Sequence, residues 1–234
     1  MRIIPYYGAK NRLSPKYPAP KHRIIIEPFA GSAGYSFLHY EHDVMLYEKN
    51  EKTFAAMSYA IRASSDEILS LPLLGQNDHI DSFDLTFEQK CLIGFWLNNG
   101  TTIPCKTLSK WGRENNERVS FWSAKCRARL SETVKKIKHW KIFNFSYEKA
   151  PDIEATWFID PPYQKAGKYY PCSSKDLDFS KLAEWCKSRH GQTIVCENQG
   201  ADWLPFKFFR QISGTSKDKE TRRKSTEVIW INEN

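Results

Sequence analysis

Short apolar runs that end in an acid recur near the start of the chain and predict strands. Residues 23–28 (RIIIEP) place three consecutive isoleucines before Glu27, and residues 44–48 (VMLYE) form a second apolar run that ends at Glu48. Between them, FAGSAGYSFLHY supplies a glycine turn and then residues that can begin a helix. Residues 51–70 carry apolar side chains at helical spacing. This order predicts a βαβ unit with parallel strands and a right-handed crossover.

The pattern changes between residues 75 and 140. Turn signals such as GQND and NNGTTIP alternate with scattered aromatic residues there, and residues 120–138 predict a helix. Strand patterns return at 141–146 (KIFNFS) and 155–159 (ATWFI), and 179–189 predicts another helix. Further strands are predicted at 192–197, about 206–212 and 226–231, the last two joined by the charged loop 217–225.

These elements predict an α/β fold with a Rossmann-like, mostly parallel sheet that ends in a C-terminal β-hairpin. Residues 1–74 and 141–234 would form the sheet domain, and residues 75–140 a small, mainly helical inserted domain. In an open sheet of this kind, ligands bind at the carboxyl ends of the strands.

Composition bears on the cellular compartment. No apolar run approaches the roughly 20 residues that a helix needs to cross a bilayer, and MRIIPYYGAK lacks the apolar stretch of a signal peptide. The six cysteines contain no CxxC pair, so we expect free thiols and neither a zinc site nor a disulfide framework. A cytoplasmic protein is the expectation.

Positive charge is concentrated in one segment. The net charge of the chain is +8, and residues 106–141 hold eleven Lys or Arg against three Glu, which is also +8. The rest of the chain therefore balances, with 24 basic and 24 acidic residues. A localised excess favours a surface that binds a polyanion, with a solvated basic helix as the alternative.

The glycine turn and the acid after the next strand predict a nucleoside site. Gly31 and Gly34 let a ligand approach the backbone, and the helix that follows offers N–H groups. Glu48 follows Gly31 by 17 residues, at a strand end where a carboxylate can accept both hydrogen bonds of a ribose diol. The chain has no GxxxxGK[ST] loop, and the spacing of this turn differs from GxGxxG, which disfavours a nicotinamide cofactor.

The stretch WFIDPPYQ (157–164) leads an apolar strand directly into an acid, two prolines and a tyrosine. Proline lacks an N–H and fixes φ, so this strand exit is stiff and its carbonyl groups stay available as acceptors. Asp160 and the Pro161 carbonyl are therefore fixed hydrogen-bond acceptors at the end of a strand. Tyr163 adds an aromatic ring directly after this turn. A proline-stiffened turn without chemistry is the alternative.

Together these stretches resemble the Dam-like, D12-class DNA adenine-N6 methyltransferases, whose motifs follow the α order. PYYGAK (5–10) is similar to the N-terminal motif of that family, and EPFAGSAGYSF (27–37) to the loop that binds the methionine side of S-adenosyl-L-methionine (AdoMet). YEKN (47–50) resembles the ribose-binding acid and DPPY (160–163) the catalytic motif. The resemblance covers most of the chain except 75–140, where the family varies with the DNA sequence read. The turn departs from the GxG of many members.

The resemblance implies an AdoMet-dependent methyltransferase fold and methyl transfer to N6 of an adenine flipped out of double-stranded DNA. It implies catalytic roles for Asp160, Pro161, Pro162 and Tyr163, with Asp160 also beside the cofactor. The residues implied to bind AdoMet are Tyr7, Lys10, Glu27, Pro28, Phe29, Ala30, Gly31, Ser32, Gly34, Glu48 and Phe145. For Phe145, packing as a core aromatic of a strand is the alternative.

Lys and Arg side chains should supply the phosphate contacts to DNA. The candidates in the insert are Lys106, Lys110, Arg113, Arg118, Lys125, Arg127 and Arg129, and those in the charged loop are Lys217, Lys219, Arg222, Arg223 and Lys224. We expect Trp111 and Trp122 to pack in the core rather than to wedge between bases. The expected protein is a monomer on DNA that needs no metal. The alternatives are methylation of RNA adenine or DNA cytosine N4, and an inactive relative that only binds nucleic acid.

Overall fold

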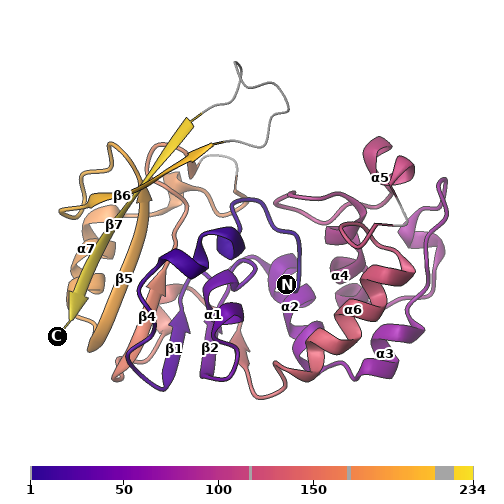
Figure 1. Cartoon of the computed structure of the whole chain (residues 1–234), viewed down its shortest axis with the longest axis horizontal. Coiled ribbons are helices and arrows are strands. Elements are labelled where there is room, and N and C mark those ends of the chain that lie inside the picture. The colour runs from indigo at the N-terminus through magenta and orange to yellow at the C-terminus, as the bar shows by residue number, and fades with distance from the viewer. Residues whose placement is uncertain (1, 116–117, 168–169, 214–223, 234) are drawn as a thin grey trace.

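A computed structural model describes residues 2–115, 118–167, 170–213 and 224–233 of the chain. Within these ranges, seven strands form one sheet in the order β3-β2-β1-β4-β5-β7-β6 (Figure 1). They are β1 (Ile24–Glu27), β2 (Asp43–Tyr47), β3 (Lys141–Phe143), β4 (Ala155–Ile159), β5 (Gly191–Asn198), β6 (Lys207–Ser213) and β7 (Lys224–Glu233). β1 to β5 pair in parallel, whereas β7 pairs antiparallel with both β5 and β6. The predicted α/β class and mostly parallel sheet are confirmed, and they are compatible with a Rossmann-like fold.

The C-terminal hairpin enters the sheet through its second strand. β7 lies beside β5, and β6 forms the outer edge. The pairing of β5 with β7 runs from Gln192 opposite Glu233 to Asn198 opposite Glu227. This register places Glu227 next to the carboxyl end of β5, the same end at which the other parallel strands finish.

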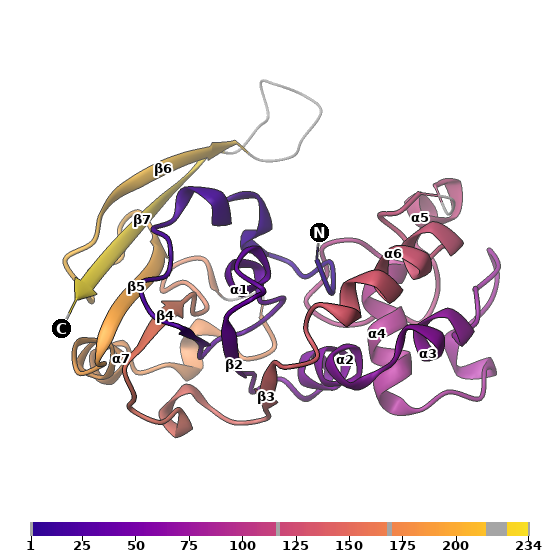
Figure 2. The same ribbon diagram turned by 60° about the horizontal axis from the view of Figure 1, so that its bottom comes forward.

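Some helices lie beside the sheet, and others gather on one side of it (Figures 1 and 2). The α-helices are α1 (Gly34–Leu38), α2 (Glu51–Arg62), α3 (Ser65–Ser70), α4 (Phe87–Leu97), α5 (Lys110–Glu114), α6 (Ala124–Lys135) and α7 (Phe179–Lys187). Short 3-10 turns are η1 (Lys10–Arg12), η2 (Ser14–Lys16), η3 (Ile80–Ser82), η4 (Tyr147–Lys149) and η6 (Ser174–Asp176). Figures 1 and 2 show α2 between the sheet and the helices α3, α4 and α6.

Two helix predictions differ from the structure. The segment 51–70 is two helices, because Ala63 adopts an extended conformation and Ser64 then starts α3 with a capping box to Glu67. The helix α4 was not predicted, because every residue from Cys91 to Leu97 is buried and its apolar residues show no amphipathic period. No helix in the described ranges is long and apolar enough to cross a membrane.

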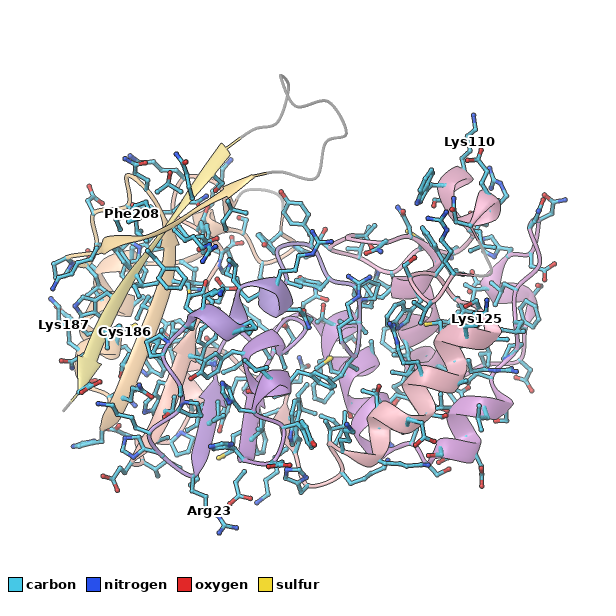
Figure 3. All side chains as sticks on the ribbon, in the orientation of Figure 1. Arg23, Lys110, Lys125, Cys186, Lys187 and Phe208 are labelled. Atoms are coloured by element: carbon cyan, nitrogen blue, oxygen red, sulfur yellow. The ribbon has the colours of Figure 1, made fainter. Side chains whose placement is uncertain are left out.

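One hydrophobic cluster joins the sheet to the insert. It contains Ile25 and Leu46 of the sheet together with Phe95 and Trp96 of α4. In Figure 3, Arg23 lies at the lower edge, just before β1, so the parallel strands run upward and their carboxyl ends face the upper side of the view. The site is built on that side.

Candidate active site

A cavity of about 250 Å³ opens where β1, β2 and β4 finish. Its wall contains Glu27 at the end of β1, Glu48 directly after β2 and Asp160 directly after β4. The structure brings every residue that the resemblance assigned to AdoMet onto this wall, namely Tyr7, Lys10, Glu27, Pro28, Phe29, Ala30, Gly31, Ser32, Gly34, Glu48, Phe145 and Asp160. Pro162 also lines the cavity, whereas Pro161 and Tyr163 are not among the residues of its wall. The roles of these residues stay predictions, but their gathering is a finding.

The two glycines of the turn are required for different reasons. Gly31 has φ +48°, in the left-handed region that favours glycine. Gly34 begins α1, and a Cβ there would lie 3.0 Å from the backbone nitrogen of Asn11. Gly34 therefore allows close packing of the N-terminal segment, in addition to lining the cavity.

Glu48 is held in place by the turn that it faces. One carboxylate oxygen accepts a hydrogen bond from the Gly31 N–H at 2.9 Å, and the other accepts one from the Asn50 N–H at 2.8 Å. Burial raises the pKa of Glu48 to about 7, against these two hydrogen bonds, which favour the charged form. A carboxylate has further lone pairs, so Glu48 can still accept hydrogen bonds from a ligand.

Glu27 serves mainly to build the turn. Its carboxylate accepts a hydrogen bond from the Ser36 N–H of α1 at 2.7 Å. Burial raises the pKa of Glu27 to about 8. Glu27 therefore ties the end of β1 to the helix that follows it.

The DPPY motif lies in a buried cluster of charged and polar groups. The Lys10 ammonium is 3.1 Å from Asp160 Oδ1 and donates a hydrogen bond to the Tyr163 hydroxyl at 2.5 Å. That hydroxyl donates to Glu227 Oε2 at 2.6 Å, and Lys10 Nζ is 3.5 Å from Glu227 Oε1. Lys10 is only 8% exposed. The N-terminal motif, the DPPY motif and the C-terminal hairpin therefore meet at one lysine.

Opposite charges balance the cost of burial in this cluster. Burial alone would lower the pKa of Lys10, but the carboxylates of Asp160 and Glu227 outweigh it and raise that pKa. Burial raises the pKa of Asp160, and the Lys10 charge opposes this rise. Burial also raises the pKa of Tyr163 well above its usual value, so its hydroxyl stays protonated. The two carboxyl groups thus favour the charged form of Lys10.

Two residues of the site were missed by sequence reasoning. Glu227 joins the cluster from β7, and its signal was an acid directly before the apolar run of a strand, in TEVIWI. Tyr170 lines the cavity and packs its ring 6.2 Å from that of Tyr6 and 5.8 Å from that of Tyr7. Its only sequence signal was an aromatic residue a few positions after the DPPY motif.

The predicted DNA-binding cations of the insert divide into two groups. Three donate hydrogen bonds to backbone carbonyl groups within the fold: Arg113 to Leu108, Arg127 to Leu71 and Arg129 to Val119. Lys106 pairs with Asp81 at 2.7 Å. Lys110, Arg118 and Lys125 have exposed side chains. In Figure 3, Lys110 projects from α5 on the upper side of the molecule.

The DNA contacts predicted in the charged loop lie largely outside the described residues. Lys217, Lys219, Arg222 and Arg223 lie outside the described residues, and Lys224 is described only as the first residue of β7. Core packing is confirmed for Trp122, which is buried, and is wrong for Trp111, whose side chain is 51% exposed on α5. The helix α5 has only five residues, and its buried residue is Gly112. The neighbouring Trp111 therefore points away from the core.

Among the residues that the structure describes, no group of three or more His, Cys, Asp or Glu side chains is arranged to hold a metal ion. The six cysteines are free thiols, and four of them are buried.

Comparisons with known proteins add little to this geometry. No family model matches the chain, and no curated protein matches it significantly. Among the matching solved structures is one described as a conserved hypothetical protein from Streptococcus pyogenes, with a TM-score of 0.39 and 13% sequence identity. That match covers 94% of this chain and 91% of the other. At this level of similarity it carries no argument about function.

Proposed function

We propose that this protein transfers a methyl group from AdoMet to the N6 amino group of adenine in double-stranded DNA, within a short specific sequence. The observation that carries the proposal is the meeting of three strand ends at one cavity. The glycine turn follows β1, Glu48 follows β2 and Asp160 follows β4, and all of them line the same space. This is the arrangement that a nucleoside cofactor and a substrate amino group would require side by side.

The cavity residues fit AdoMet. Glu48 is fixed by two backbone hydrogen bonds and has lone pairs left for the ribose diol. Phe29 stacks on Tyr147 with ring centres 5.2 Å apart, and Phe145 lines the same wall with a 55% exposed side chain. These rings offer an apolar surface to an adenine ring. When bound, AdoMet supplies an electrophilic methyl group on a sulfonium, so the reaction needs no covalent enzyme intermediate.

Asp160 and the Pro161 carbonyl would orient and activate the substrate amino group. The adenine N6 is a poor nucleophile because its lone pair is delocalised into the ring. Two acceptors that take hydrogen bonds from N6 favour a more pyramidal nitrogen and gain strength as positive charge develops on it. Lys10 holds Asp160 in place for this role. It also lies 4.6 Å from the centre of the Tyr163 ring. Tyr163 would stack on the flipped base.

Backbone contacts between the insert and the cavity support a role for the insert in bringing DNA to the site. The Tyr7 N–H donates to the Thr101 carbonyl at 3.1 Å, and the Gly100 N–H donates to the Pro5 carbonyl at 2.9 Å. The segment that lines the cavity is therefore joined to a loop of the insert. The exposed Lys110 rises on the upper side, where the parallel strands end and the β6–β7 hairpin also lies (Figures 1 and 3).

The test is methyl transfer from tritiated AdoMet to unmethylated DNA, RNA and protein, followed by identification of the labelled base. We expect N6-methyladenine in DNA. Label in N4-methylcytosine or only in RNA would support the alternative substrates, and DNA binding without transfer would support an inactive relative. Absence of label from DNA would overturn the proposal.

We predict that Asp160→Ala abolishes transfer while AdoMet still binds, because Asp160 acts on the substrate amino group. Transfer is measured with the tritium assay and binding by calorimetry. Asp84→Ala is the matched control, since Asp84 is an exposed acid of the insert. Loss of AdoMet binding in Asp160→Ala would mean that the site is assigned wrongly.

A further inference from the structure

We infer that Glu227 is a positioning residue of this active site, which anchors the Tyr163 hydroxyl and shares Lys10 with Asp160. The inference rests on the proposed function. It concerns a residue of the C-terminal hairpin, which lies outside every motif that suggested the activity. Glu227 is separated from Tyr163 by 64 positions in the chain, and only the fold brings them together.

The position of Glu227 leaves its side chain little freedom. It is 5% exposed and lies on β7, between Asn198 of β5 and Arg210 of β6. Strands on both sides fix the backbone, and the carboxylate points to the cluster, where it meets Tyr163 at 2.6 Å and Lys10 at 3.5 Å. Burial of a carboxylate has a desolvation cost in free energy, and partners such as Tyr163 and Lys10 offset it.

Glu227 completes a chain of oriented hydrogen bonds. The Lys10 ammonium donates to the Tyr163 oxygen, and the Tyr163 hydroxyl hydrogen is directed to Glu227. Without the final acceptor, this hydroxyl has no fixed direction and Lys10 loses one of its two carboxylate partners. The tyrosine of the DPPY motif and the lysine beside Asp160 are therefore both positioned from β7.

Glu227 also changes the charge that Asp160 experiences. If both acids are ionised, two carboxylates share the single Lys10 ammonium and repel each other. The nearby Tyr17, Tyr170 and Cys196 stay neutral, because burial raises the pKa of each. Two further acids face the cluster. Burial raises the pKa of Glu27 to about 8. Burial also raises that of Glu197, against hydrogen bonds from the Gln164 and Asn198 N–H groups.

Removal of the Glu227 charge should therefore have a defined electrostatic effect. In Glu227→Gln, Lys10 pairs with Asp160 alone and favours the ionised form of Asp160. The pKa of Asp160 then falls, and the acid limb of the pH–rate profile for methyl transfer moves to lower pH. A purely structural role for Glu227 would lower activity without this movement.

The experiment compares wild type, Glu227→Gln and Glu227→Asp in methyl transfer to DNA, with AdoMet binding and melting temperature measured alongside. For Glu227→Gln we expect kcat to fall on the order of 10- to 100-fold, as small displacements of catalytic groups do. AdoMet affinity should stay near that of wild type, and the acid limb should shift to lower pH. Glu227→Asp keeps the charge and should return the acid limb to its original position. Glu233→Gln, on the same strand but exposed, is the matched control.

Three outcomes would overturn the inference. One is a Glu227→Gln protein with wild-type kcat and pH profile. Another is an equal loss in both variants with a lowered melting temperature and an unmoved acid limb. The third is a crystal structure of Glu227→Gln in which Tyr163 and Lys10 keep their positions. The proposed function fails separately, through absence of methyl transfer to DNA by the wild type.

Discussion

Glu48 is the residue on which AdoMet affinity should depend most strongly. Burial raises its pKa to about 7, and hydrogen bonds from a ribose diol would favour the ionised form. A ligand that prefers the ionised acid binds more tightly above this pKa and more weakly as pH falls through it. We therefore predict that AdoMet affinity decreases as the pH is lowered below about 7, measured by calorimetry on either side of that value.

Glu27 lines the same wall, and burial raises its pKa to about 8. Substitution of Glu48 shows which of the two acids controls the pH dependence of AdoMet binding. Glu48→Gln should weaken AdoMet binding about 10- to 100-fold, since a hydrogen bond to a charged group contributes roughly 1.5–3 kcal/mol. The pH dependence should be lost as well. Glu51→Gln, an exposed acid in the first turn of α2, serves as the control. If the pH dependence survives in Glu48→Gln, another group is responsible.

At this scale, most of the residues predicted at the cavity share one property. They belong to short stretches at strand ends, and the carboxyl ends of neighbouring parallel strands must meet. Tyr7 and Lys10 precede β1, and only the resemblance of PYYGAK pointed to them. Glu227 could not be found in this way, because its place depends on which strand the hairpin inserts beside β5. Strand order within a hairpin leaves no local pattern in the sequence.

At the scale of elements, the packing of α4 supports the wall of the cavity. A Cβ on Gly94 would lie 2.7 Å from both the Cys105 carbonyl oxygen and the Pro104 side chain. The Cys105 N–H also donates to the Gly94 carbonyl at 3.0 Å. The helix and the loop that follows it are therefore in direct backbone contact, and this loop contains the Thr101 that binds Tyr7.

We predict that Gly94→Ala destabilises the protein by about 1–3 kcal/mol, because the added methyl group overpacks a contact with backbone. Chemical denaturation measures the change. The loop should shift with it, so DNA methylation should fall more than AdoMet binding does. Gly100→Ala tests the specificity of the effect: nothing lies within 4 Å of a Cβ there, although its φ of +79° adds strain. If Gly94→Ala and Gly100→Ala lose equal stability, overpacking at Gly94 is not the cause and the prediction is wrong.

Elements were predicted best where their pattern was periodic or bounded by clear turns. The apolar runs that became β1, β2, β4 and β5 were located to within a residue or two. The helix α4 was not predicted, because burial on all sides removes the amphipathic period of its sequence. The break between α2 and α3 depends on the extended Ala63 and the cap at Ser64, which a continuous apolar spacing conceals.

At the scale of the whole molecule, the sequence locates the charge excess in one segment, and the structure shows that several of its cations already have partners within the fold. Three arginines of the insert donate to carbonyl groups of their own fold, and Arg129 also lies 5.2 Å from the Trp96 ring centre. The sequence shows how much charge a segment carries. Only the structure shows which cations the fold already uses.

DNA affinity should therefore depend on the exposed Lys110 and Lys125 more than on the arginines that hold the insert together. Each lysine that contacts a phosphate releases counterions, so the plot of log affinity against log salt should lose about 0.9 of its slope per lost contact. We predict a reduced slope for Lys110→Ala combined with Lys125→Ala, measured by fluorescence anisotropy with duplex DNA. Phosphate contacts carry no sequence information, so the methylated sequence should stay the same.

Lys187→Ala is the control, because Lys187 lies on α7 at the side of the molecule away from the insert (Figure 3). Arg127→Ala offers a contrast: it should lower the melting temperature, since its guanidinium donates to the Leu71 carbonyl, and the salt slope should change little. A slope that stays unchanged in the double lysine variant, or falls equally in the Lys187 variant, would place the DNA on another face. The insert would then serve to support the cavity rather than to bring the duplex to it.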